Sequence, residues 1–78
     1  MNNIETRLKN IMAHVLNVSV NEIKDDSSAY TIANWDSLKH LDLVLALQKE
    51  FGIKFGDEEI PTLINYQMIL NTLKAYLE

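Results

Sequence analysis

The fold is decided by the stretch Trp35-Asp36-Ser37-Leu38-Lys39-His40-Leu41-Asp42-Leu43, which continues to Phe51-Gly52. Asp36 is a good N-cap residue, because its carboxylate can accept a hydrogen bond from a backbone N–H of the first helical turn. Leu and Ala dominate the residues that follow, and glycine is the residue expected just past a helix end. We therefore predict a helix from Ser37 to Phe51, with the clearest boundaries in the sequence.

Apolar residues cover two separate faces of this predicted helix, when the residues are placed about 100° apart on a helical wheel. One face suits the core and consists of Leu43, Val44, Leu47 and Phe51. The other face, which we call the leucine stripe, consists of Leu38, Leu41 and Leu45. A chain of 78 residues cannot easily surround a helix. The leucine stripe is thus a candidate partner surface, unless a loop residue such as Ile32 or Trp35 folds over it.

Further helices are predicted on both sides of this stretch. Apolar residues at three- and four-residue steps predict an amphipathic helix from Ile4 to Leu16. Asn65 can cap a last helix, whose apolar residues at helical spacing are Met68, Ile69, Leu73, Tyr76 and Leu77. Before it, the acidic residues 57–59 suit the start of a short helix that ends near Ile64, with Pro61 tolerated in the first turn.

The segments between these helices lack helical periodicity. Residues 17–35 are rich in Ser, Asn and Asp and predict a long loop, which Ile23, Tyr30 and Ile32 are expected to pack. One helical turn with a capping box fits residues 19–22. Residues 53–55 are too few to form a sheet and predict an extended connector. Residues 1–78 are therefore expected to form a single all-α domain, a small bundle of four helices, three longer and one short, with a long loop between the first two.

Composition excludes several classes of function. The chain has 11 acidic against 7 basic residues and a net charge of −4, which argues against nucleic acid as a partner. It has no cysteine, so apolar packing alone must hold the core, and a reducing cytosol is permitted. No apolar run has the length of a membrane span, and the first residues do not resemble a signal peptide. We expect a cytoplasmic monomer without membrane contact.

An enzyme and a metal site are also not expected. A chain this short rarely builds a catalytic cleft, and it shows no Gly-rich phosphate loop, no HExxH motif and no arguable Ser-His-Asp set. His14 and His40 lack a third ligand at metal spacing, so no metal is predicted. His40 is interpreted either as a contact for a ligand or partner or as an exposed histidine without a role. Trp35 is expected to anchor the loop against the bundle.

Ser37 lies just after the N-cap residue, where a helix exposes a hydroxyl and free backbone N–H groups. A phosphate ester at this position would meet those donors and the positive end of the helix dipole. The residues alone therefore favour an anion attached at Ser37 and an apolar group along the leucine stripe. Taken alone, however, a serine in the first helical turn most often reflects only helix-start chemistry.

The order of these features resembles the carrier-protein family, and acyl carrier proteins in particular. An Asp-Ser-Leu triplet opens the second helix of that family, as at Asp36-Ser37-Leu38, and Phe-Gly-Ile follows it, as at residues 51–53. The resemblance implies that a phosphopantetheinyl transferase esterifies Ser37 with 4'-phosphopantetheine, whose terminal thiol carries cargo as a thioester. It also implies that Asp36 helps to hold Ser37 for the transferase. Partner enzymes would recognise a surface formed by Leu38, Leu41, Asp42 and Leu45.

Two departures from the family pattern favour a specialised carrier. Residues 32–35 replace the Asp-Leu-Gly sequence that often precedes the triplet, and they are similar to Trp-Asp-Ser-Leu variants of specialised biosynthetic carriers. Fatty-acid carriers are usually acidic at the positions of Lys39, Gln48 and Lys49. We predict a stand-alone acyl carrier for a dedicated pathway, with acyl- or aminoacyl-loading and condensing or transferring enzymes as partners. The alternatives are an aminoacyl or peptidyl carrier and an unmodified helical interaction module.

Overall fold

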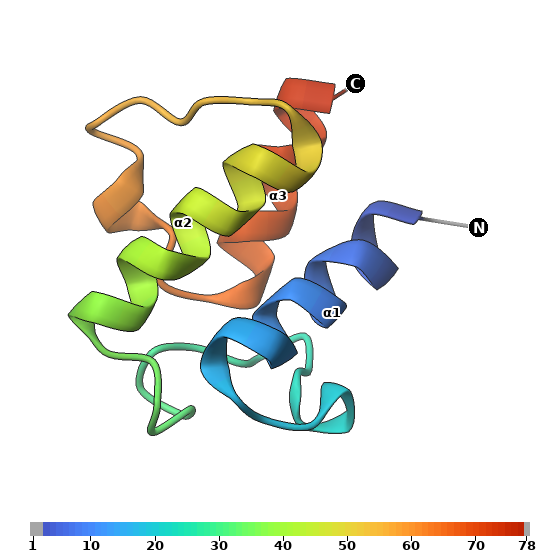
Figure 1. The fold of residues 1–78 in the computed structure, drawn as a ribbon, viewed down its shortest axis with the longest axis vertical. Helices are drawn as coiled ribbons and strands as arrows, with labels where there is room; N and C mark the ends of the chain where they lie inside the picture. The colour runs from blue at the N-terminus through green and yellow to red at the C-terminus, as the bar shows by residue number, and fades with distance from the viewer. Residues whose placement is uncertain (1–2, 78) are drawn as a thin grey trace.

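Three α-helices pack around one core in the computed structural model, which describes residues 3–77 (Figure 1). They are α1 (Asn3–Leu16), α2 (Ser37–Phe51) and α3 (Tyr66–Leu77). Single 3₁₀ turns, η1 (Val20–Glu22) and η2 (Ile60–Thr62), interrupt the two long connections. The described residues form no strand, only an isolated antiparallel bridge between Ser28 and Asn65. The predicted all-α class is confirmed, but the number of α-helices is three.

Both ends of α2 lie at the predicted residues. The Asp36 carboxylate accepts a hydrogen bond from the Lys39 backbone N–H at 2.9 Å. At the other end Gly52 has a φ of 66°, in the left-handed region that glycine adopts without strain, and its N–H donates to the Gln48 carbonyl. Capping residues therefore determine where α2 begins and ends.

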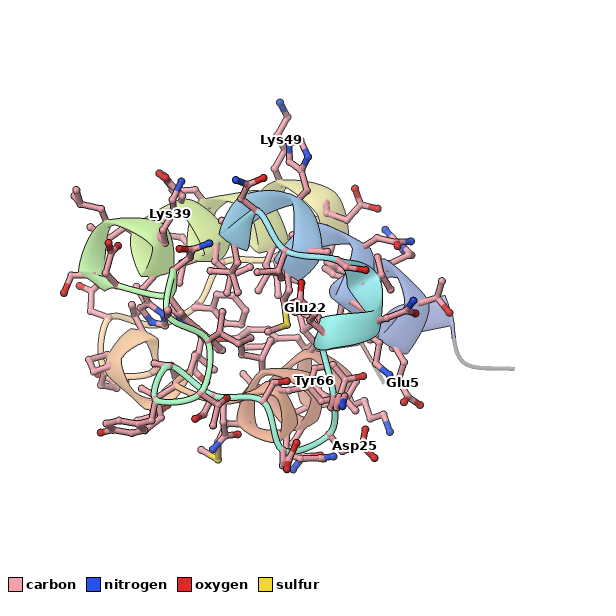
Figure 2. The ribbon with its side chains drawn as sticks, turned by 90° about the horizontal axis from the view of Figure 1, so that it is seen from below. Glu5, Glu22, Asp25, Lys39, Lys49 and Tyr66 are labelled. Carbon is pink, nitrogen blue, oxygen red and sulfur yellow. The ribbon has the colours of Figure 1, made fainter. Side chains whose placement is uncertain are left out.

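The core lies between the three helices and takes its side chains from every part of the chain. In α2 the buried residues are Leu43, Val44 and Leu47, as the helical wheel predicted. Phe51 is half-buried, and the Arg7 guanidinium lies 4.4 Å from its ring centroid. Tyr66 of α3 is fully buried (Figure 2). Burial raises the pKa of Tyr66 to about 12, and the negative charges of Glu5 and Asp25 act in the same direction.

The long loop between α1 and α2 is ordered by its own side chains and by three hydrogen bonds, two to α1 and α3 and one to the segment just before α3. Ile23 and Ile32 are buried as predicted, and η1 has the predicted capping box at Ser19. Tyr30, by contrast, is 88% exposed, so the expectation that it packs the loop is wrong. These hydrogen bonds are Asn34 Nδ2 to the Leu16 carbonyl (2.9 Å), the Tyr66 N–H to the Ser27 carbonyl (2.8 Å) and the Ala29 N–H to the Ile64 carbonyl (2.9 Å).

The short third helix expected before residue 64 is not an α-helix. Residues 57–59 form turns, and only η2 follows them. The Glu59 carboxylate accepts hydrogen bonds from the Gly56 N–H at 2.8 Å and from the Tyr76 hydroxyl of α3. These bonds hold residues 56–59 as a turn, so the acidic residues do not open a helix. Pro61, which has no N–H to donate, lies within η2.

Helix α3 is capped by Asn65, whose Oδ1 accepts a hydrogen bond from the Met68 N–H at 2.7 Å, as predicted. Its buried residues are Tyr66, Ile69, Leu70 and Leu73. Met68, Tyr76 and Leu77 were expected on the apolar face, but each is exposed by about two-fifths. The buried face therefore begins at Tyr66, two residues before Met68, and ends at Leu73. None of the helices described within residues 3–77 has the length and apolar character needed to cross a membrane.

Replacing Tyr76 with Phe tests the tie between α3 and the 56–59 turn. The hydrogen bond from the Tyr76 hydroxyl, followed by that from the Gly56 N–H, lowers the pKa of the Glu59 carboxyl. A carboxyl with a lowered pKa stabilises the fold above its unfolded-state value, and this contribution is lost as the pH falls through the folded-state pKa. Y76F should therefore raise the Glu59 pKa toward the ordinary value, as measured by NMR titration of the carboxyl carbon.

The matched control is Y30F, because the Tyr30 side chain is exposed. It should leave the titration of Glu59 unchanged. If Y76F and Y30F gave the same Glu59 titration curve, the tie would be contradicted.

Candidate functional site

Ser37 is the first residue of α2, and its side chain is exposed. None of the hydrogen bonds among residues 3–77 involves Ser37 Oγ. The two residues that precede the N-cap fix its position. Asn34 is tied to the end of α1, and Trp35 is only 4% exposed. A free hydroxyl is therefore presented at a rigid point on the surface.

Asp36 caps α2 and has no hydrogen bond to the Ser37 side chain. Its Oδ1 accepts from the Lys39 N–H, and its carbonyl accepts from the His40 N–H at 2.8 Å. The N–H groups of Ser37 and Leu38 remain without an intrahelical partner, as at the start of any helix. The sequence predicted free backbone N–H groups around Ser37. One of them, the N–H of Lys39, is not free, because it donates to the Asp36 carboxylate. An anion on Ser37 would share the positive end of the helix dipole with Asp36.

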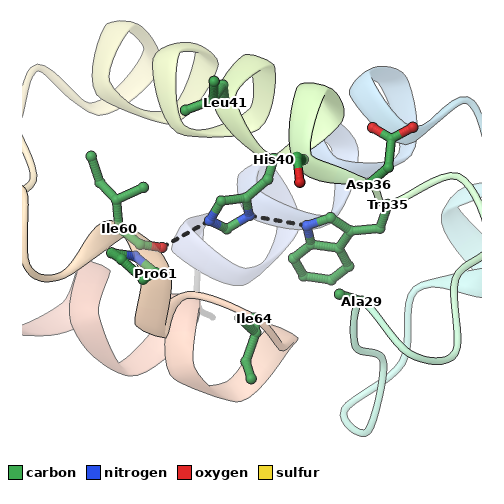
Figure 3. Close-up of a pocket in the computed structure, with 9 residues that line it drawn as sticks. Ala29, Trp35, Asp36, His40, Leu41, Ile60, Pro61 and Ile64 are labelled. Carbon is green, nitrogen blue, oxygen red and sulfur yellow. Dashed lines mark hydrogen bonds between the residues drawn. The ribbon is translucent and has the colours of Figure 1, made fainter.

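An apolar groove of about 480 Å³ lies beside Ser37. We call it the Ser37 groove, and its lining residues are Ala29, Trp35, Asp36, Ser37, His40, Leu41, Ile60, Pro61 and Ile64. Figure 3 shows Ile60, Pro61 and Ile64 facing His40 and Trp35 across it. Asp36 is the only acidic residue in the lining. The groove thus joins the start of α2 to η2 and to the loop before α2, next to the exposed hydroxyl.

His40 connects both sides of the Ser37 groove through its two ring nitrogens (Figure 3). Trp35 Nε1 donates to His40 Nδ1 at 3.1 Å, and His40 Nε2 lies 2.8 Å from the Ile60 carbonyl oxygen. Since an indole nitrogen only donates, Nδ1 must be unprotonated and Nε2 must carry the proton. The prediction that Trp35 anchors the loop is confirmed. His40 is half-buried and has a structural partner on each side, which neither sequence interpretation anticipated.

The leucine stripe is open to solvent. Leu38, Leu41 and Leu45 are 75%, 53% and 63% exposed, and Asp42 beside them is exposed as well. Ile32 and Trp35 are buried in the core cluster, so the alternative in which they cover the stripe is wrong. Leu41 belongs both to the stripe and to the lining of the Ser37 groove. The apolar surface is therefore continuous from α2 into the groove.

The charges around the leucine stripe have both signs. Lys39 and Lys49 point outward from α2 (Figure 2), while Asp36 and Asp42 are exposed acids on or just before the same helix. Glu50 is occupied by Arg7, whose Nε lies 2.9 Å from its carboxylate. Arg7 and Glu50 thus form an ion pair that joins α1 to α2.

The structure adds site residues that the sequence did not indicate. Ala29, Ile60, Pro61 and Ile64 come from segments distant along the chain and meet only through the fold. For His40 a signal was present, because it precedes the buried residues Leu43 and Val44 by three and four positions. Residues at this spacing share a helix face. A histidine on the core face needs partners for both ring nitrogens.

A rigid helical domain that presents a free hydroxyl beside an apolar groove and an open apolar helix face has the form of a carrier domain. The sequence model of the family "Phosphopantetheine attachment site" matches residues 6–71, most of the chain. The chain therefore belongs to this family, and the resemblance seen in the sequence is confirmed. Members covalently bind 4'-phosphopantetheine, are non-catalytic as domains, and interact with phosphopantetheinyl transferases and biosynthetic enzymes.

The residues at the start of α2 fit such a group. Ser37 Oγ is exposed and free for esterification. The adjoining groove offers apolar surface to whatever the group carries, and the Ser37 and Leu38 N–H groups are available to a phosphate. Among residues 3–77 no three side chains of the metal-ligating types gather at one point.

The hydrogen bonds of His40 predict its tautomer. We expect nitrogen NMR of the labelled protein at neutral pH to show an unprotonated Nδ1 and a protonated Nε2. The W35F variant removes the indole donor, and it should change the Nδ1 shift of His40 while leaving that of the exposed His14 unchanged. A protonated Nδ1 in the wild type would contradict the bond from Trp35.

Proposed function

We propose that this protein is an acyl carrier protein in which Ser37 is the attachment site of 4'-phosphopantetheine. The observation that carries the proposal is the exposed, unbonded hydroxyl of Ser37 at the capped start of α2, within the residues matched by the family. Residues 1–78 then act as one carrier domain, which binds no metal and relies on partner enzymes for catalysis.

In this proposal different residues of the chain have different roles. When bound, 4'-phosphopantetheine supplies a flexible arm with a terminal thiol that holds acyl cargo as a thioester. Asp36 fixes the first turn of α2 and so holds Ser37 in place for the transferase. The Ser37 groove shields apolar parts of the arm or its cargo from water near the attachment point. No step of bond making or breaking is assigned to a side chain of this protein other than the Ser37 hydroxyl.

Partner enzymes dock on the leucine stripe in this proposal. Leu38, Leu41 and Leu45 are large apolar side chains that a lone small domain gains nothing by exposing, whereas burial against a partner stabilises a complex. Asp42, Lys39 and Lys49 surround the stripe and would orient the partner. Because these charges are mixed, we place the carrier in a specialised pathway with its own enzymes. The same geometry serves an aminoacyl or peptidyl carrier equally well.

The attachment site is tested by intact mass after incubation with coenzyme A, magnesium and a broad-specificity phosphopantetheinyl transferase. The wild type should gain one phosphopantetheinyl group. S37A should gain none, while its circular dichroism spectrum stays that of the wild type, because the Ser37 side chain has no partner in the fold. A wild type left unmodified by several transferases would favour the alternative of an unmodified helical interaction module.

Replacing Leu41 with Asp tests the docking surface. Removing an apolar anchor and adding a charge should slow the loading of Ser37 by about tenfold, equivalent to about 1.4 kcal/mol. Because Leu41 is more than half exposed, the free energy of unfolding should fall by less than about 1 kcal/mol. Loading is followed by mass spectrometry, and stability by urea denaturation.

Two variants serve as controls for L41D. L77D places the same change on an exposed leucine of α3 and should load at the rate of the wild type. L43D buries a charge in the core and should prevent folding. If L41D proved as destabilising as L43D, Leu41 would belong to the core and the docking surface would lie elsewhere.

A further inference from the structure

Ser37 is preceded by two residues that both bond to His40. The His40 backbone N–H donates to the Asp36 carbonyl at 2.8 Å, as in any first helical turn. The second bond joins side chains, because Trp35 Nε1 donates to His40 Nδ1 at 3.1 Å (Figure 3). The two rings also stack, with centroids 6.2 Å apart and an interplanar angle of 23°. His40, which follows Ser37 in the same helix, therefore holds both residues that lead into it.

The other side of the His40 ring is fixed to a different segment of the chain. Nε2 lies 2.8 Å from the Ile60 carbonyl oxygen of η2. This bond keeps the ring in the orientation in which Nδ1 faces Trp35. The Asp36 cap, by contrast, acts within α2, since its carboxylate bonds to the Lys39 N–H. The position of the Trp35 ring thus depends on a histidine that is itself held from η2.

The Trp35 side chain belongs to the buried core cluster. Removing the acceptor at His40 Nδ1 would leave the indole N–H of this buried residue without its partner, which is unfavourable. An indole that turned toward water instead would carry the backbone of residues 35 and 36 with it. Ser37 follows directly, so its hydroxyl would then no longer be held at one place.

We propose that His40 is a positioning residue for the loading of Ser37, and that it acts through Trp35. This inference rests on the proposed function, because it concerns the reaction in which Ser37 accepts the phosphopantetheinyl group. In that reaction Ser37 Oγ forms a bond to the pantetheine-bearing phosphorus of coenzyme A. The P–O bond to the second phosphate breaks, adenosine 3',5'-bisphosphate leaves, and the hydroxyl proton passes to the transferase. A shift of about 1 Å in a reacting atom can slow a reaction by about 10²-fold.

A positioning role and a purely structural role predict different kinetics. A variant that is only less stable contains less folded protein, which raises the apparent KM of the transferase for the carrier and leaves the rate at saturation unchanged. A variant whose Ser37 is misplaced still presents the leucine stripe for docking, so KM stays and kcat falls. The two kinetic constants therefore separate the two roles.

The test measures kcat and KM of a broad-specificity phosphopantetheinyl transferase for the unmodified full chain, with coenzyme A and magnesium saturating and mass spectrometry as the readout. H40L removes both ring nitrogens and keeps an apolar side chain. It should lower kcat about tenfold and change KM by less than about twofold. The matched control is H14L, the same substitution at an exposed histidine of α1, which should keep both constants. L41D should instead raise KM, because it alters the docking surface.

Two conservative variants separate the two ring nitrogens of His40. The Oδ1 of an asparagine is as many bonds from the backbone as the Nδ1 of a histidine, so H40N keeps an acceptor for Trp35. The Nε2 of a glutamine corresponds in the same way to the histidine Nε2, so H40Q keeps the donor to the Ile60 carbonyl. H40N should restore kcat to within about threefold of the wild type, and H40Q should stay near H40L. The opposite order would overturn the proposal.

W35F removes the donor from the other side of the bond and covers the case in which H40L does not fold. It should lower kcat and leave KM unchanged. The double variant W35F/H40L should be no slower than the slower single variant, because both substitutions remove the same bond. Losses that multiplied would mean that Trp35 and His40 act independently, and they would overturn the proposal.

Failure of this inference can be told apart from failure of the proposed function. If H40L matched H14L in kcat, His40 would not position Ser37, although Ser37 carries the group. If the wild type gained no mass at Ser37 with several transferases, both this inference and the proposed function would be overturned.

Discussion

Burial of one face of α2 in the core, next to α1, is the constraint on which the rest of the structure depends. Leu43, Val44 and Leu47 take up that face, and their burial fixes the rotation of α2 about its axis. Successive residues are about 100° apart, so a rotation by one residue would move the leucine stripe toward the core and carry core residues into water. The exposure of the stripe and the direction of Ser37 are therefore consequences of how the opposite face packs.

The start of α2 needs a second support, because a helix end has fewer core contacts than its middle. Trp35 supplies it from the loop, and His40 supplies it one turn into the helix, where a purely apolar residue would leave the indole N–H and the Ile60 carbonyl unpaired. The exposed hydroxyl of Ser37 lies between these two supported residues. A side chain on a supported stretch of backbone is held in position more precisely than one on an unsupported loop.

Sequence reasoning succeeded where local chemistry decides the structure. The caps at Asp36, Gly52 and Asn65 gave the boundaries of α2 and the start of α3, and the wheel of α2 separated its buried face from its exposed one. It failed at residues 57–62, where acidic residues before a proline fit a helix start and a turn equally well. The hydrogen bond from the Tyr76 hydroxyl, which is distant along the chain, to the Glu59 carboxylate stabilises the turn. The Ser37 groove could not be predicted for the same reason, since its lining residues come from three segments that are separate along the chain.

The last turn of α3 supports one wall of the Ser37 groove, although it is distant from that wall along the chain. Tyr76 holds Glu59, the residue directly before Ile60, and packs edge-on against Phe55 with ring centroids 5.6 Å apart. The wall that faces His40 is thus braced from the last turn of the final helix. Unwinding that turn would remove both contacts, so this wall of the groove would lose its support although no lining residue had changed.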